Sequence, residues 1–358
     1  MLIYITIYLL TMFFALTSPR QRSNSLITII FLCIIVFFRD NTVGTDVASY
    51  SINFHRINWH KYSWNYYLPF EPGFNYFILF FKYYIINNPM ICWGTIGIIY
   101  VLCFYKFANK YTQNVNIALL CFYLLGTYFL VFNIMRQCFA CAILLLIFTH
   151  TNIVNPTKKD IIISIVFIFL IGLLLHPTIF IFYTYLLYHI KAINRLISKK
   201  IMIIALCVSF IIFYTQAIIP FLSSFIDTSS AEGKLINYAM RNIQNNEDSG
   251  FSITKIILIT IFQIYLIFIS SNPKNIFLFT GTCGVLFLNC FGVLVLEFAR
   301  VYELLISLQI IYLSEMWSIK KHNTLTMLYK PILLLYLTAI FMNILFKNYG
   351  EIIPYHLR

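Results

Sequence analysis

Long apolar segments, separated by short clusters of charged and polar residues, follow one another along the whole chain. A transmembrane helix needs about 20 apolar residues, although shorter segments also occur. The pattern therefore predicts an all-α polytopic membrane protein with about twelve transmembrane helices. These segments are Met1–Leu16, Leu26–Phe38, Met90–Tyr105, Ile117–Phe132, Ile134–Phe148, Ile161–Leu175, Thr178–Ile190, Ile201–Ile219, Ile253–Ile269, Ile276–Leu296, Val301–Trp317 and Pro331–Phe346.

A further apolar segment, Phe74–Ile86, is too short to cross a bilayer and contains Lys82. We interpret it as an interfacial or re-entrant helix. It belongs to the first of two long loops, residues 39–89 and 220–252. Residues 1–358 are expected to form one integral membrane domain.

The basic residues predict the orientation of the helices, because Lys and Arg favour the cytoplasmic side. Three stretches long enough for a helical hairpin have Lys at both ends: Lys110 to Lys158, Lys159 to Lys191, and Lys274 to Lys320. Two basic ends on one side require an even number of crossings. Each hairpin tip, both long loops and both termini are therefore predicted to lie on the outer face.

The composition supports a membrane protein and excludes other classes. Apolar residues make up 61% of the chain and charged residues only 10%, whereas about a quarter of a soluble protein is charged. The net charge of +13 is spread over short loops, so we expect no nucleic-acid partner. No nucleotide-binding or zinc-binding motif is present, and we therefore expect no cofactor and no metal.

Ionisable residues occur at all three predicted hairpin tips. The first tip carries Arg136, the second His176, and the third Glu297, Arg300 and Glu303. A charged group near hydrocarbon costs about 2.5–3.5 kcal/mol unless it is paired or hydrated. Because all three tips are predicted on the same side of the membrane, these residues predict a polar cavity at the outer face. The alternatives are that Arg136 is an interfacial anchor, His176 a turn residue, and Arg300 part of a structural ion pair with its neighbouring glutamates.

The first long loop adds carboxylates and aromatic residues to this face. Arg39, Asp46, Tyr50 and Glu71 occur there. The loop also contains Trp59, Trp64, Tyr66 and Tyr67. Carboxylates accept hydrogen bonds from sugar hydroxyls, and aromatic rings stack on sugar rings. The pattern is typical of a glycan-binding loop, although an interfacial aromatic belt would contain the same Trp and Tyr residues.

The order of these motifs resembles the EpsG family of Wzy-like polysaccharide polymerases, which includes O-antigen polymerases. The similarity extends from Arg39 to Arg300, nearly the whole chain. The motifs are Arg39, Gly44-Thr45-Asp46, Tyr50, Glu71-Pro72-Gly73-Phe74, Arg136-Gln137 with Ala140, His176-Pro177-Thr178, and Arg300. Pro177 is a variation on the family's usual pattern.

The resemblance implies a glycosyltransferase-C-like membrane enzyme of the bacterial cytoplasmic (inner) membrane, with its active face on the periplasmic side. Such enzymes transfer a growing glycan from undecaprenyl diphosphate to a lipid-linked oligosaccharide repeat unit. The substrate is then an undecaprenyl-diphosphate-linked oligosaccharide, and a chain-length regulator protein is a potential partner. An O-antigen ligase and a flippase or transporter of lipid-linked oligosaccharide remain alternatives.

This chemistry gives each candidate residue a hypothetical role. A diphosphate leaving group needs fixed cations, and arginine makes bidentate contacts to phosphate, so Arg136 and Arg300 are expected to bind it. His176 is the first candidate for the general base and Asp46 the second, with Glu71 a further alternative. Glu303 is expected to orient Arg300. Three more residues are candidates for substrate binding: Arg39, Tyr50 and Glu71.

Overall fold

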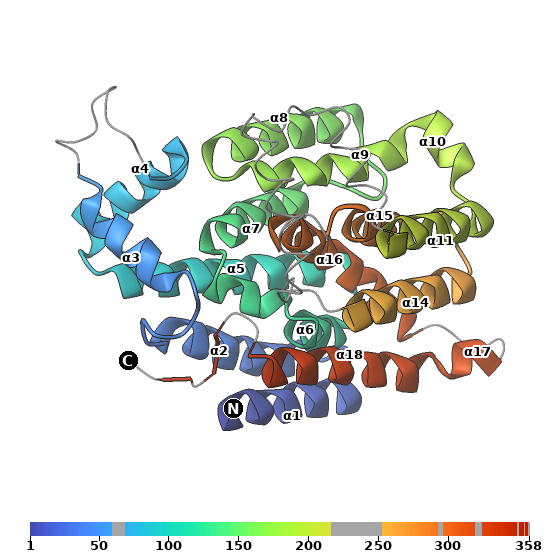
Figure 1. The fold of residues 1–358 in the computed structure, drawn as a ribbon, viewed down its shortest axis with the longest axis horizontal. Coiled ribbons are helices and arrows are strands. Elements are labelled where there is room, and N and C mark those ends of the chain that lie inside the picture. Colours follow the sequence, from blue (N-terminus) through green and yellow to red (C-terminus); the bar gives the residue numbers. More distant parts are fainter. Residues whose placement is uncertain are drawn as a thin grey trace. The chain divides into compact units, whose positions relative to one another are not determined.

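The computed structural model describes residues 1–58, 69–215, 253–292, 296–318, 324–348, 351–353 and 355–356, and this part is helical without a β-strand (Figure 1). Over their described residues, all twelve predicted apolar segments fall largely on helices. Two helices, Pro89–Tyr111 and Tyr329–Phe346, are long and apolar enough to cross a membrane. The chain is thus a helical protein with candidate membrane spans, and the number twelve stays a prediction.

The contacts divide the chain into two compact units, and the predicted single domain stays a prediction. The first unit comprises Met1–Tyr183, Leu313–Ile319 and Leu333–Arg358. The second comprises Thr184–Tyr312 and Lys320–Ile332.

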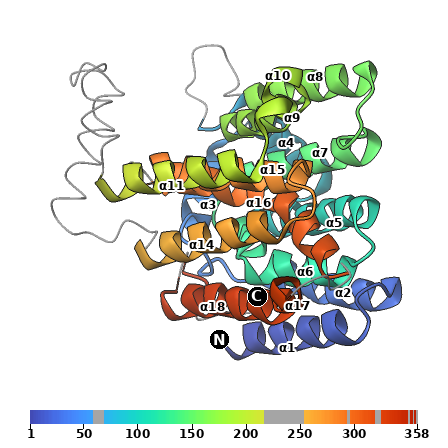
Figure 2. The same ribbon diagram turned by 90° about the vertical axis from the view of Figure 1, so that its right-hand side faces the viewer.

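The first unit is built around a long central helix, α5 (Pro89–Tyr111), which packs mainly against α7 (Met135–His150) and α2 (Arg22–Phe38). Its other helices are α1 (Leu2–Thr17), α3 (Val47–Arg56), α4 (Pro72–Phe80), α6 (Val115–Leu124), α8 (Lys158–Leu174) and most of α18 (Tyr329–Phe346). Figures 1 and 2 show α18 beside α1, and the Tyr8 hydroxyl on α1 lies 3.2 Å from that of Thr338 on α18.

Local sequence signals explain how α5 begins and packs. The Asn88 side chain accepts hydrogen bonds from the backbone N–H groups of Met90 and Ile91, and proline occupies the first helical position. Asparagine at the N-cap and proline at the first position both favour this start. At Gly97 a Cβ atom would lie 2.3 Å from Val36 on α2. The two helices therefore pack closely because glycine leaves room.

The predicted interfacial segment 74–86 is helical, as expected. α4 continues directly into one turn of π-helix, η2 (Phe81–Ile85). Lys82 on this turn donates hydrogen bonds to the carbonyls of Phe54 and Ile57 at 3.2 and 3.1 Å. These carbonyls belong to the C-terminal end of α3, where a cation is favourable. Lys82 thus fixes α3 to α4.

The two described hairpin tips contain short 3₁₀ helices that the apolar pattern alone did not predict. In the first, α6 ends before Gly126, whose φ is +87°, and η3 (Thr127–Phe132) leads to α7. In the second, α8 is followed by η4 (Pro177–Phe182). Arg136 consequently lies in the first turn of α7, and His176 is the N-cap residue of η4.

The start of the first long loop is anchored at a glycine. Gly44 has φ +110°, and a Cβ atom there would lie 2.2 Å from the carbonyl oxygen of Phe132. Its N–H donates to the carbonyl of Glu351 near the C-terminus, and the next residue, Thr45, donates from its N–H to Oδ1 of Asn133 at 2.7 Å. The loop is thereby fixed to the tip that precedes Arg136.

The second unit contains α9 (Tyr183–His189), α10 (Lys191–Leu196), α11 (Lys199–Thr215), α14 (Ile253–Ile269), α15 (Ile276–Phe291), α16 (Leu296–Met316) and α17 (Thr324–Met327). α9 and α16 each extend into the first unit at one end. Buried polar side chains join three of these helices: Asn289 on α15 donates to Ser209 on α11 and accepts from Thr260 on α14. The predicted second outer loop, 220–252, lies outside the described residues.

We predict that Gly44→Ala destabilises the first unit by about 2–4 kcal/mol, because it combines the cost of a positive φ with a clash against a backbone carbonyl. The measurement is the free energy of unfolding of the purified protein in detergent. Thr42→Ala is the matched control, since Thr42 is exposed in the same loop. Equal stability of the two variants would contradict the prediction.

Candidate functional site

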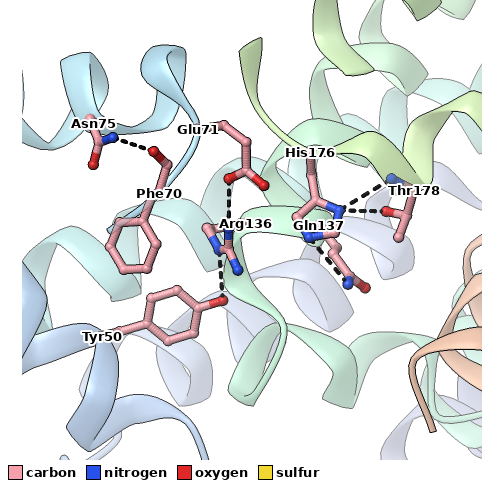
Figure 3. Close-up of polar contacts among 8 residues, drawn as sticks. All are labelled: Tyr50, Phe70, Glu71, Asn75, Arg136, Gln137, His176 and Thr178. Atoms are coloured by element: carbon pink, nitrogen blue, oxygen red, sulfur yellow. Dashed lines mark hydrogen bonds and ion pairs between the residues drawn. The ribbon is translucent and has the colours of Figure 1, made fainter. Parts of the chain in front are cut away.

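Arg136 is the centre of the candidate site, and its guanidinium contacts two residues of the first long loop. Nη1 lies 2.6 Å from Oε2 of Glu71, and Nε donates to the Tyr50 hydroxyl at 3.3 Å (Figure 3). The side chains of Arg136 and Glu71 are 24% and 21% exposed. The third nitrogen, Nη2, has no hydrogen-bond partner among the described residues. The Nη2 group is therefore available to an anionic ligand.

Glu71 is positioned by the glycine and proline that follow it. Pro72 is the first residue of α4, which suits the fixed φ of proline. Gly73 lies so close to α8 that a Cβ atom would be 2.7 Å from the carbonyl oxygen of Leu174. This contact places Glu71 at the end of α8, beside the tip that carries His176. The Glu71-Pro72-Gly73 motif thus has a steric explanation.

Three aromatic side chains, Tyr50, Phe70 and Trp93, pack next to the Glu71–Arg136 ion pair. Phe70 stacks on Tyr50 with 5.4 Å between the ring centroids, and the Arg136 guanidinium carbon lies 4.9 Å from the centroid of Phe70. Trp93 of α5 meets the edge of Tyr50 at 5.7 Å. Burial raises the pKa of the Tyr50 hydroxyl, so this group stays neutral at physiological pH and can accept the Arg136 hydrogen bond.

His176 lies on the other side of Arg136 and is connected to α7 through Gln137. Its Nε2 is 3.5 Å from Nε2 of Gln137, the residue after Arg136. Its Nδ1 is 2.8 Å from the Thr178 hydroxyl and accepts from the Thr178 backbone N–H at 3.3 Å (Figure 3). The imidazole is therefore held from both sides, by η4 and by α7.

The tautomer of His176 depends on Thr178. The hydroxyl can donate or accept, whereas the backbone N–H can only donate. When the hydroxyl accepts a hydrogen bond from Nδ1–H, Nε2 carries a lone pair instead of a proton. When Nδ1 accepts, the proton resides on Nε2, and the buried Oε1 of Gln137, which has no partner among the described residues, could accept it after an amide flip. Because the backbone N–H of Thr178 donates to Nδ1, the neutral imidazole in this conformation carries its proton on Nε2.

Arg39 is fully buried, with no exposed surface. Nη2 contacts the sulfur of Met135 at 3.3 Å, and the guanidinium carbon lies 4.9 Å from the centroid of Phe132. Within the described residues Nε and Nη1 have no hydrogen-bond partner. Burial lowers the pKa of Arg39 to about 10, which still leaves it charged at neutral pH. In this conformation Arg39 contacts the residue before Arg136 and is closed to a substrate.

Asp46 lies at the N-terminal end of α3, one turn before Tyr50. Its Oδ1 is 3.4 Å from the Thr45 hydroxyl, and the side chain is partly exposed. Among the described residues it has no ion pair with Arg136. Asp46 is thus near the site but outside the group formed by Tyr50, Glu71 and Arg136.

The residues of the third predicted tip belong to the second unit, on α16. The side chains of Glu297 and Arg300 lie outside the described part of the structure. Glu303 is nearly buried, and its Oε1 lies 3.8 Å from Nζ of Lys255 on α14. The predicted role of Glu303 in orienting Arg300 remains a prediction.

Sequence reasoning did not single out Phe70, Asn133 or Lys255. Each carries a signal in retrospect. Phe70 immediately precedes Glu71, Asn133 is an amide in an otherwise apolar tip, and Lys255 is a charge in an apolar segment. In transmembrane segments such a charge points to a partner. Trp59, Trp64, Tyr66 and Tyr67, which were expected to face a glycan, lie outside the described residues.

The arrangement suits the binding of an anion next to a group that can exchange protons. Arginine donates charge-assisted hydrogen bonds to phosphate, and here Nη2 remains for such a ligand while Nη1 and Nε are held by a carboxylate and a phenol. In the described part of the chain, no group of three or more His, Cys, Asp and Glu side chains could hold a metal ion.

Comparison with known proteins identifies the family of the chain. The sequence model of the EpsG family matches residues 24–357, nearly the whole chain. No curated protein and no solved structure matches the chain.

We predict that the Glu71–Arg136 ion pair contributes about 1 kcal/mol of coupling energy, as expected for a partly exposed pair. A double-mutant cycle with Glu71→Gln and Arg136→Gln, measured by unfolding in detergent, tests this. The cycle of Glu71→Gln with Arg56→Gln is the control, since Arg56 is exposed on α3 and should show additive losses. Additive losses in both cycles would exclude the ion pair.

Proposed function

The chain belongs to the EpsG family of Wzy-like polymerases, and from this membership and the Arg136 site we propose that it polymerises a lipid-linked polysaccharide. A growing glycan is transferred from undecaprenyl diphosphate to the terminal sugar hydroxyl of a lipid-linked repeat unit. The reaction takes place at the outer face of the bacterial cytoplasmic membrane, as in O-antigen polymerisation. The open Nη2 of Arg136 is the observation that carries this proposal.

Arg136 binds the diphosphate of the donor in this mechanism. When the new glycosidic bond forms, the bond from the sugar C1 to the diphosphate oxygen breaks and negative charge develops on the leaving group. A pre-oriented guanidinium stabilises that charge without reorganisation. The first turn of α7 contributes in the same direction, because the N-terminal end of a helix is electrostatically positive. Arg300 is proposed as a second cation.

His176 is proposed as the general base that accepts the proton of the attacking hydroxyl. Imidazole titrates nearest to neutral pH among the side chains. To act as a base at Nε2, the ring must carry its proton on Nδ1, and the Thr178 hydroxyl 2.8 Å away can accept a hydrogen bond from that group. Glu71 is a weaker candidate, because its carboxylate is already engaged by the Arg136 guanidinium at 2.6 Å. Asp46 remains the second candidate.

The surface polysaccharide of a strain lacking the gene tests the proposed function. Complementation with the wild-type gene should restore a ladder of long chains, whereas Arg136→Ala should leave single repeat units and reduce long chains by about 100-fold or more, as expected for loss of a charge-stabilising donor. Arg56→Ala should restore the ladder, and immunoblots check that each variant is present in the membrane.

Other outcomes of this experiment would overturn the proposal. Accumulation of lipid-linked polymer with no attached chains would indicate a ligase. The absence of repeat units from the outer face would indicate a flippase. A normal ladder in Arg136→Ala would remove Arg136 from the site.

Thr178 provides a test of the proposed base. His176→Ala should lower the polymerisation rate by about 10²–10⁴-fold, the usual contribution of general-base catalysis. Thr178→Val should lower it by about 10-fold or more, since it removes a hydrogen bond to the imidazolium that forms, whereas Thr178→Ser keeps the hydroxyl and should remain active. The rates are measured with purified protein and lipid-linked repeat units. Equal rates for the Val and Ser variants would show that the hydroxyl does not orient His176.

A further inference from the structure

The first unit contains a cavity of about 660 Å³ that the candidate site does not use. Its charged lining consists of three basic side chains, Arg20, Arg22 and Lys110, and one acidic side chain, Glu315. They come from the turn between α1 and α2, the C-terminal end of α5, and the end of α16. The volume is typical of a small-molecule binding site.

This cavity lies at the opposite end of the helices from Arg136. Trp93, which contacts Tyr50, is near the start of α5, and Lys110 is near its end. At 1.5 Å per residue, this separation corresponds to about 25 Å along the helix. α7 has the same polarity: Arg136 is in its first turn, and Lys110 donates to the carbonyl of Thr151, just after its last residue. The cavity is therefore a separate feature, on the predicted cytoplasmic side.

The basic side chains of the cavity are not neutralised by the described residues around them. Arg20 donates from Nη2 to the Ser318 hydroxyl at 3.1 Å, which supplies no negative charge. The guanidinium of Arg22 has neither a hydrogen bond nor an ion pair within the described part of the chain. Glu315 in the lining and Asp160 near Lys110 offset part of this charge, but three cations against two carboxylates still leave an excess of positive charge. This excess favours an anion, and arginine favours phosphate in particular.

An exposed apolar stripe on α2 begins one turn after Arg22. Leu26, Ile30 and Ile34 follow it at intervals of four residues, which places them on one face of the helix, and they are 50%, 57% and 43% exposed. In a membrane protein such a face contacts lipid acyl chains. A phosphate-binding cavity that continues into an apolar stripe has the two chemical parts of a phospholipid, whereas free phosphate would use only the first.

We propose that this cavity binds the headgroup of an anionic glycerophospholipid, with an acyl chain along α2. The phosphate contacts Arg20 and Arg22, and Lys110 adds positive charge at the back of the cavity. Basic pockets between helices on the cytoplasmic side are chemically suited to anionic lipid headgroups. The bound lipid fixes the turn between α1 and α2 against the ends of α5 and α16.

Native mass spectrometry of the full-length protein in detergent tests this proposal. Phosphatidylglycerol should bind with a defined stoichiometry, and phosphatidylcholine with the same acyl chains should bind much more weakly. The double variant Arg20→Gln/Arg22→Gln should bind phosphatidylglycerol about 30-fold more weakly, given the usual contribution of two basic residues near anionic lipid.

Lys158→Gln/Lys159→Gln is the matched control, because it removes two exposed charges on the same predicted face outside the cavity, and its binding should remain that of the wild type. The single variant Arg22→Gln breaks no hydrogen bond among described residues, so it tests the proposal if the double variant does not fold. Its affinity for phosphatidylglycerol should be about fivefold lower than that of the wild type.

Two results would overturn the proposal. The first is unchanged binding of phosphatidylglycerol in the Arg22→Gln variant. The second is displacement of the lipid by inorganic phosphate at equal concentration, which would identify a site for soluble phosphate.

Discussion

The arrangement of the site depends on how one guanidinium is held at the end of an apolar helix. Arg136 lies where the positive end of α7 disfavours a cation, and it is three-quarters buried. Glu71 compensates that charge, and Tyr50 and Phe70 surround the rest of the group. Since Glu71 and Tyr50 come from the first long loop, the charge of Arg136 also orders this loop over the hairpin tip. The same ion pair between Arg136 and Glu71 thus positions the loop and orients the guanidinium for an anion.

The sequence was sufficient for the long apolar helices of this fold but not for its turns or for the short polar helix α3. Apolar segments predicted the helical stretches because burial from water is encoded in composition and period. The 3₁₀ turns η3 and η4 depend on tertiary contacts, such as the hydrogen bond from the Tyr100 hydroxyl to the carbonyl of Thr127, which no local pattern reports. α3 could have been found, because Val47, Tyr50 and Phe54 are buried on one face of a short amphipathic helix.

The candidate site was predictable as a set of residues but not as a geometry. The order of the motifs along the chain predicted Arg136, Glu71 and His176 as site residues. The pairing of Arg136 with Glu71 could not be predicted, because it depends on the close approach of α4 to α8 at Gly73. Burial was the property most difficult to predict. Arg39 and Arg136 look alike in the sequence, yet Arg39 is fully buried whereas Nη2 of Arg136 remains available. Arg39 is enclosed by Phe132 and Met135, with Tyr4, Tyr128 and Tyr355 nearby.

This difference between the two arginines suggests how the site keeps its shape without a ligand. A buried guanidinium with two unpaired nitrogens is costly, so Arg39 is tolerated only where the surrounding packing holds it. Arg39 contacts two residues around the start of α7. Phe132 is the last residue of η3, and Met135 is the residue before Arg136. Arg39 is therefore a positioning residue, whose rigid plane limits the movement of the first turn of α7. A site built in this way presents Nη2 of Arg136 in a fixed direction before an anionic ligand arrives, and this reduces the reorganisation that binding would otherwise require.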